Sequence, residues 1–226
     1  MKRNKHFAIV AILFGALMAC TLPSLGGQHL FVTLSPAAGE TADAASLRQA
    51  GDTIGKRLNK NGISSRTILL GKQIVVVMPP TTNYTTVLPL LTEEGRITFV
   101  DSINSLLVGS DISSDLPVIL TNEDIKSATV EDGSQVNAGP GFIIVIYFNE
   151  AGAKKLADYS RTNVGHYLVI ARDGRVISSP YVNTAITGGS AIIQGNLTEQ
   201  SAQELAAFIS TESLPFPMQD TNHETK

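Results

Sequence analysis

Apolar positions in the first half of the chain recur with the periods of alternating strands and helices. Four short apolar runs predict strands, at residues 30–34, 67–70, 73–78 and 96–100. Apolar residues also recur at helical spacing in two segments between these strands, residues 44–61 and 81–94. The resulting order of strand, helix, strand, strand, helix, strand predicts a ferredoxin-like βαββαβ base over residues 29–101.

A β-hairpin is the clearest local feature of the second half. Two β-favouring runs, Tyr167–Arg172 and Arg175–Ser178, are separated only by Asp173-Gly174. This pair readily adopts the positive φ angles of a type I′ turn. The two runs are therefore predicted to pair as antiparallel strands.

Helices are predicted on both sides of this hairpin. Apolar residues recur at helical spacing after Asn149 and again after Thr198, and both residue types are suited to cap the N-terminus of a helix. Thr121 and Asp124 have the spacing of a capping box. This spacing predicts a short helix over residues 122–127.

These elements divide the chain into a base and a head. The head is predicted to be an α+β unit with antiparallel strands over residues 119–217, and the polar, glycine-containing segment 102–118 is predicted to connect it to the base. Residues 218–226 are predicted to be a C-terminal tail, which leaves one edge of the base sheet open. We therefore expect the head to fold on its own and the base to be less stable alone.

The N-terminus has the pattern of a bacterial lipoprotein signal. Three basic residues precede the apolar run 7–19, which is too short to cross a bilayer of about 30 Å as a helix. Leu17-Met18-Ala19-Cys20 is similar to a lipobox, in which the cysteine becomes the first mature residue and carries acyl chains. We therefore expect residues 1–19 to be a signal peptide, Cys20 to be lipidated and residues 20–28 to form a tether. The alternative is an unmodified cysteine within an ordinary signal peptide.

Composition and charge narrow the range of partners. The chain is 43% hydrophobic and 16% charged, which is typical of a globular protein. Without Lys2, Arg3 and Lys5 of the signal peptide, 14 of the 17 basic side chains remain against 20 acidic ones, which argues against nucleic acid or an anionic lipid surface as a partner. Cys20 is the only cysteine, so no disulfide is expected, and no second apolar run is long enough for a transmembrane helix.

Residues suited to metal or nucleotide chemistry are few in the mature chain. His29, His166 and His223 lack the spacing of a zinc site. His166 stands at a strand start, which is more typical of a surface or half-buried histidine than of a ligand or a general base. Gly188-Gly189 is followed by a strand rather than by the helix that a phosphate-binding loop requires. No metal or cofactor is predicted.

Candidate catalytic groups are equally sparse. Ser178-Ser179 lacks the GxSxG and SxxK patterns of serine nucleophiles and precedes Pro180, as turn residues do. Glu93-Glu94 and Glu131-Asp132 are adjacent in sequence, which is more typical of a solvated face than of a general acid and base pair. The sequence therefore favours a non-enzymatic protein.

Six short motifs follow one another through the second half of the chain: Phe148–Ala153, Asn163–Gly165, Asp173–Pro180, Ile186–Gly189, Ile193–Thr198 and Leu214–Pro217. Their order and approximate spacing resemble the head of the first large periplasmic domain of SecD, a subunit of the SecDF accessory complex of the bacterial protein-export translocase. The predicted βαββαβ order resembles the base of the same domain. The resemblance implies a role that involves exported polypeptides.

Three functions are compatible with these observations. The leading one is a lipid-anchored, non-catalytic module on the extracytoplasmic side of the cell membrane or outer membrane. It would bind exported polypeptides or components of the Sec translocase, either by strand addition to a sheet edge or in a shallow apolar groove. The alternatives are an envelope scaffold lipoprotein without an export role, and a hydrolase in which His166 acts with a serine and a carboxylate.

Overall fold

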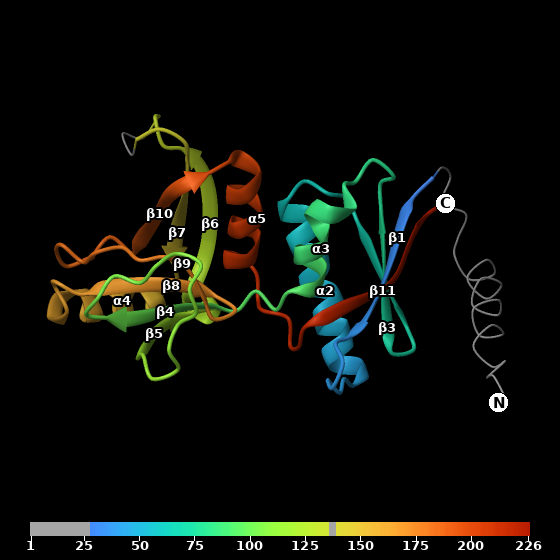
Figure 1. The fold of residues 1–226 in the computed structure, drawn as a ribbon, viewed down its shortest axis with the longest axis horizontal. Helices are drawn as coiled ribbons and strands as arrows, with labels where there is room; N and C mark the ends of the chain where they lie inside the picture. The colour runs from blue at the N-terminus through green and yellow to red at the C-terminus, as the bar shows by residue number, and fades with distance from the viewer. Residues whose placement is uncertain (1–27, 136–138) are drawn as a thin grey trace, which may run out of the picture.

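The chain folds into an α+β structure with three antiparallel sheets (Figure 1). The computed structural model describes residues 28–135 and 139–226. The predicted signal peptide 1–19, Cys20 and the tether up to residue 27 lie outside these described residues. The predicted fold class, an α+β protein with antiparallel strands, is confirmed.

The base sheet has the strand order of a ferredoxin-like fold. Its order is β11-β1-β3-β2, and neighbouring strands pair antiparallel. Helices α2 (Ala44–Lys60) and α3 (Tyr84–Thr92) lie on the face that is turned toward the head (Figure 1). Every second residue of β1 and β3 packs in the core with α2. The strands are β1 (Leu30–Pro36), β2 (Arg66–Leu70), β3 (Gln73–Met78) and β11 (Met218–Thr225).

The identity of the fourth base strand corrects two predictions. Residues 218–226 are not a tail, because β11 pairs with β1 along its length and closes the edge that was expected to be open. Strand β4 (Ile97–Ser102), predicted to complete the base, belongs to the head instead. There β4 lies between two strands and buries side chains on both faces. Phe99 packs in the main core cluster and Val100 in a second, smaller cluster.

The sheet β5-β4-β8-β9 forms one half of the head. Segment 102–118, predicted to connect two domains, instead joins β4 to β5 within this sheet, and its first and last residues belong to these strands. The N–H of Ile112 donates to the carbonyl of Gly174 (2.8 Å), and Leu106 and Leu116 pack against the second core cluster. The chain therefore crosses between base and head at residues 93–96 and 210–217. The other strands of this sheet are β5 (Val118–Thr121), β8 (Tyr167–Arg172) and β9 (Arg175–Ser178).

The sheet β10-β7-β6 forms the other half of the head. The predicted N-caps are confirmed, because the side chains of Asn149 and Thr198 each accept a hydrogen bond from a backbone N–H in the first turn. The helix predicted at 122–127 is only a 3-10 turn, Asn122–Asp124, since the residues from Ile125 onward pair with β7. The elements are β6 (Ile125–Asp132), β7 (Phe142–Phe148), α4 (Glu150–Thr162), β10 (Ser190–Leu197) and α5 (Glu199–Ile209).

The predicted β8–β9 hairpin is confirmed. Asp173 and Gly174 have φ angles of 49° and 80°, as a type I′ turn requires. The Asp173 carboxylate also accepts hydrogen bonds from the backbone N–H groups of Gly95 (3.0 Å) and Arg96 (2.7 Å). The turn therefore also holds the segment through which the chain enters the head.

Candidate functional site

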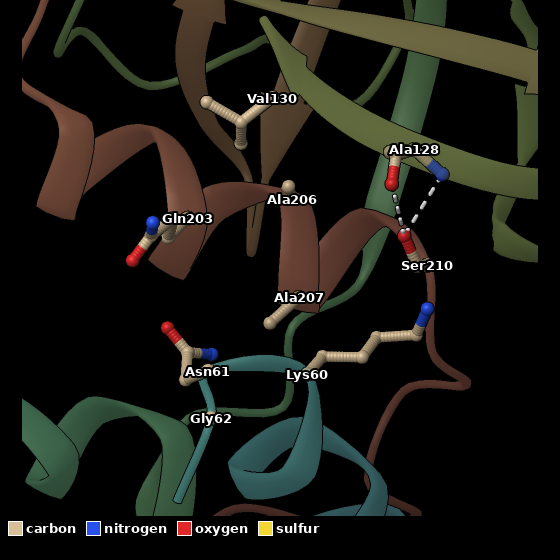
Figure 2. Close-up of a pocket in the computed structure, with 9 residues that line it drawn as sticks. All are labelled: Lys60, Asn61, Gly62, Ala128, Val130, Gln203, Ala206, Ala207 and Ser210. Atoms are coloured by element: carbon tan, nitrogen blue, oxygen red, sulfur yellow. Dashed lines mark hydrogen bonds between the residues drawn. The ribbon is translucent and has the colours of Figure 1, made fainter.

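A groove lies where the base meets the head. Its volume is about 340 Å³, and it is bounded by the end of α2, by β6 and by α5 (Figure 2). The residues that line it are Lys60, Asn61 and Gly62 from the base and Ala128, Val130, Gln203, Ala206, Ala207 and Ser210 from the head.

One wall of this junction groove is the outer edge of β6. Because β6 ends the order β10-β7-β6, no described strand lies beside that edge. The Ser210 hydroxyl accepts a hydrogen bond from the N–H of Ala128 (2.9 Å) and donates one to its carbonyl (3.3 Å) (Figure 2). Alternate residues of an antiparallel strand direct their backbone groups to the same edge, so the N–H and C=O of Val130 are also directed away from β7. Val130 is one of the residues that line the groove. Backbone groups directed outward in this way are those with which an added strand pairs.

The remaining walls are small or polar. Ala206 and Ala207 of α5 are buried and carry only methyl groups, which leaves space above them. Gly62, with a φ of 71°, ends α2 without a side chain. Lys60 is exposed, and within residues 28–135 and 139–226 its ammonium makes no ion pair. The junction groove therefore combines a strand edge, a small apolar floor and one cationic group.

Arg57, one turn before Asn61 on α2, joins the base to both segments that cross into the head. Its side chain is fully buried. The guanidinium donates to the carbonyl oxygens of Glu93 (2.7 Å) and Glu94 (2.5 Å) on one crossing segment. It also donates to the Thr211 hydroxyl (3.4 Å) on the other. One side chain thus holds both connections in place.

Phe208 of α5 lies against two guanidinium groups. The central carbons of Arg57 and Arg172 are each 4.6 Å from the centre of its ring, a cation–π geometry. Burial lowers the pKa of Arg57 to about 10, and the charges of Asp173 and Glu93 act against this shift. These contacts fix α5, and with it the floor of the junction groove, relative to the base.

The sequence patterns predict neither the role of Arg57 nor the junction groove. One signal was available, because Arg57 follows Ile54 by three residues and precedes Leu58, which places a charge within the apolar stripe of α2. The groove has no comparable signal. Its walls come from three segments that are far apart in the sequence.

The structure brings His166 to a carboxylate but places the candidate serines elsewhere. His166 Nδ1 lies 2.9 Å from Asp101 Oδ1, and the Tyr159 hydroxyl donates to the same oxygen (2.6 Å). Burial, together with this hydrogen bond, raises the pKa of Tyr159 above its usual range. Ser178 is buried in β9, and the Ser179 hydroxyl accepts a backbone hydrogen bond from the β4–β5 loop (3.1 Å). Asp101 belongs to β4 and Tyr159 to α4, so their hydrogen bond links α4 to β4, and His166 contacts the same carboxylate.

The adjacent carboxylates Glu93 and Glu94 also have structural partners. Glu93 and Glu94 form ion pairs with Arg172 (3.2 Å) and Arg96 (2.5 Å). Gly188-Gly189 leads into β10, not into a helix. Across residues 28–135 and 139–226, no group of three or more histidines, cysteines or carboxylates could hold a metal ion. In the same part of the chain, no helix has the length and apolar character needed to cross a membrane.

Comparison with known proteins identifies related sequences. The family model described as SecDF, P1 head subdomain, matches residues 101–216. The protein translocase subunit SecD of Acidaminococcus fermentans is 28% identical over 203 residues, which are 88% of this chain and 45% of that protein. SecD of Dictyoglomus turgidum is 27% identical over 202 residues, 88% of this chain and 47% of that protein. The chain spans about half the length of these relatives.

Two solved structures have the same fold. The crystal structure of SecDF in the super-membrane-facing form has a TM-score of 0.73 at 23% identity, and the match covers 96% of this chain and 34% of that one. A structure described as that of a membrane component SecDF that enhances protein export has a TM-score of 0.68 at 24% identity, with 85% and 98% of the two chains covered. The likeness in fold includes both the base and the head.

Proposed function

Because the chain belongs to the SecDF family through its P1 head subdomain, we propose that it assists protein export by binding extended segments of exported polypeptides. The junction groove is the proposed binding site. Export is proposed because the relatives that match 88% of this chain are protein translocase subunits. The mode of binding is inferred from the groove, because the names of the relatives do not state how they bind polypeptides.

The observation that carries this proposal is the direction of the Val130 backbone. Its N–H and C=O are directed to the edge of β6 that has no described strand beside it, and Val130 lines the junction groove between this strand and α5. An extended polypeptide that adds to such an edge is held by its backbone, so its side chains can vary. The methyl groups of Ala206 and Ala207 leave room for those side chains. Exported proteins share no common sequence, and backbone pairing suits this variety.

Photo-crosslinking in cells tests the site. A photoreactive residue at Gln203, in the junction groove, is expected to capture exported polypeptides, whereas the same residue at Asp52, on the exposed side of α2, is expected to capture few. Val130→Pro removes the N–H that an added strand needs, and proline is tolerated on edge strands. We expect this change to lower the Gln203 yield several-fold, and Val130→Thr to preserve it.

The same experiment separates the competing functions. An undiminished yield with Val130→Pro would show that polypeptides do not pair with β6. Capture of one constant envelope protein in place of many exported chains would favour the scaffold function. Thermal unfolding of both Val130 variants, compared with that of the original chain, shows whether a lost yield reflects lost binding or lost structure.

We further propose that a lipid on Cys20, which lies outside the described residues, holds the protein at the extracytoplasmic face of a membrane. Each buried methylene contributes about 0.8 kcal/mol, so two or three acyl chains anchor a protein stably, whereas one chain does not. Cys20→Ala is expected to move the protein from the membrane to the soluble fraction, and Ser24→Ala in the tether is the matched control. Fractionation after a high-salt wash and mass spectrometry of the N-terminus are the measurements. An unmodified Cys20, or a Cys20→Ala protein that still sediments with membranes, would contradict the anchor.

A further inference from the structure

Lys60 is the one charged side chain among the described residues that line the junction groove. The other polar side chains there are the neutral amides of Asn61 and Gln203 and the hydroxyl of Ser210. No aspartate or glutamate is among these lining residues, although acidic side chains outnumber basic ones in the whole chain by 20 to 17. The junction groove is thus positive in a chain whose net charge is −3.

The Lys60 ammonium is not needed to end helix α2. A lysine in the last turn of a helix often donates to the terminal carbonyl groups. Here the backbone N–H and the side-chain amide of Asn61 both donate to the carbonyl of Arg57 (3.2 and 3.0 Å), and the N–H of Gly62 donates to the carbonyl of Asn59 (2.9 Å). Within residues 28–135 and 139–226, the Lys60 ammonium has neither an ion pair nor a hydrogen bond. It is therefore available to a bound ligand.

Lys60 extends toward the end of the groove that Ser210 closes (Figure 2). The Ser210 hydroxyl already bonds both the N–H and the C=O of Ala128. An added strand can therefore pair with β6 from Val130 onward but not at Ala128. A side chain at this end of a bound segment comes close to the Lys60 ammonium.

We infer that the junction groove selects segments of exported polypeptides that carry an aspartate or glutamate side chain at this end, and that Lys60 selects them. This inference rests on the function proposed for the groove and adds a charge preference to it. A carboxylate beside the unpaired ammonium gains an ion pair, whereas a lysine or arginine side chain meets a like charge. Because Lys60 is exposed, water screens the pair, and we expect a preference of about two- to fivefold. Backbone pairing with β6 remains the main source of binding.

The charge of the captured segments tests this inference. With the photoreactive residue at Gln203, mass spectrometry of the crosslinked peptides from cells should show acidic residues enriched about two- to fivefold over their frequency in the exported proteins. Lys60→Met should remove this enrichment, and Lys60→Glu should replace it by an enrichment of basic residues. Both variants should keep the total yield within about twofold, since the edge of β6 is unchanged. Lys56→Glu, an exposed position one turn earlier on α2 that does not line the groove, is the matched control and should keep the acidic enrichment.

The possible failures are distinguishable. Capture of exported chains without acidic enrichment, or an enrichment that survives Lys60→Met, would overturn the role of Lys60 and leave the proposed function intact. The absence of any captured exported chain would refute the proposed function and this inference together. Crosslinks confined to the last residues of the captured chains would assign the carboxylate to a chain end, which contradicts selection of an acidic side chain. Thermal unfolding of the Lys60 variants verifies that they fold.

Discussion

A fragment of residues 119–217 is expected to remain unfolded in isolation, although the sequence alone predicts that it folds independently. The fragment lacks β4, which lies between β5 and β8 in the head. Ile97, Phe99 and Val100 of β4 are fully buried. Burial of such a side chain contributes roughly 1.5–3 kcal/mol. The loss of all three is comparable to the total stability of a typical domain, about 5–15 kcal/mol.

A fragment of residues 93–217, which restores β4, is the matched control. It is expected to give a dispersed amide spectrum and one cooperative urea transition, whereas the shorter fragment should show neither. Because α5 also packs against α2, this longer fragment should be less stable than the full chain. A dispersed spectrum from residues 119–217 would mean that β4 is not needed for the head to fold.

Arg57→Met is expected to lower the free energy of unfolding by about 3 kcal/mol or more. The change leaves the carbonyl oxygen of Glu93 without its guanidinium donor and that of Glu94 with only the backbone N–H of Leu214. It also removes the guanidinium from the face of Phe208. Each hydrogen bond to a charged group contributes about 1.5–3 kcal/mol. Part of this loss is offset, because methionine avoids the cost of burying a charge. Urea unfolding of the full chain measures the difference.

Two further variants make this measurement specific. Arg48→Met changes an exposed arginine of the same helix and should alter stability by no more than about 0.5 kcal/mol. Arg57→Lys keeps the charge but has neither the five donors nor the planar group, so it should recover little of the loss. A change below about 1 kcal/mol for Arg57→Met would show that the two crossing segments are held mainly by other contacts.

The features that the sequence predicted correctly depend on neighbouring residues. The Asp173-Gly174 turn follows from the φ angles that these two residues accept, and the helices after Asn149 and Thr198 begin where a polar side chain can satisfy the first backbone N–H groups. The strands and helices of the N-terminal half are likewise predicted by the spacing at which apolar residues recur along the chain. Short-range sterics and hydrogen bonding decide these features, so they are visible in a window of a few residues.

Outside the β8–β9 hairpin, tertiary structure alone decided which strands became neighbours. Apolar residues at 96–100 predict a strand equally well in the base or in the head, and only the pairing of β4 with β5 and β8 buries Phe99 and Val100 on opposite faces. The polar β11 has little apolar pattern of its own and becomes a strand because β1 offers it a free edge. The burial of Arg57 and the junction groove depend on the same long-range pairing. Backbone hydrogen bonds between distant segments carry no local sequence signature. The sequence by itself therefore determined the elements with a strong local pattern, whereas long-range pairing determined β11 and the site.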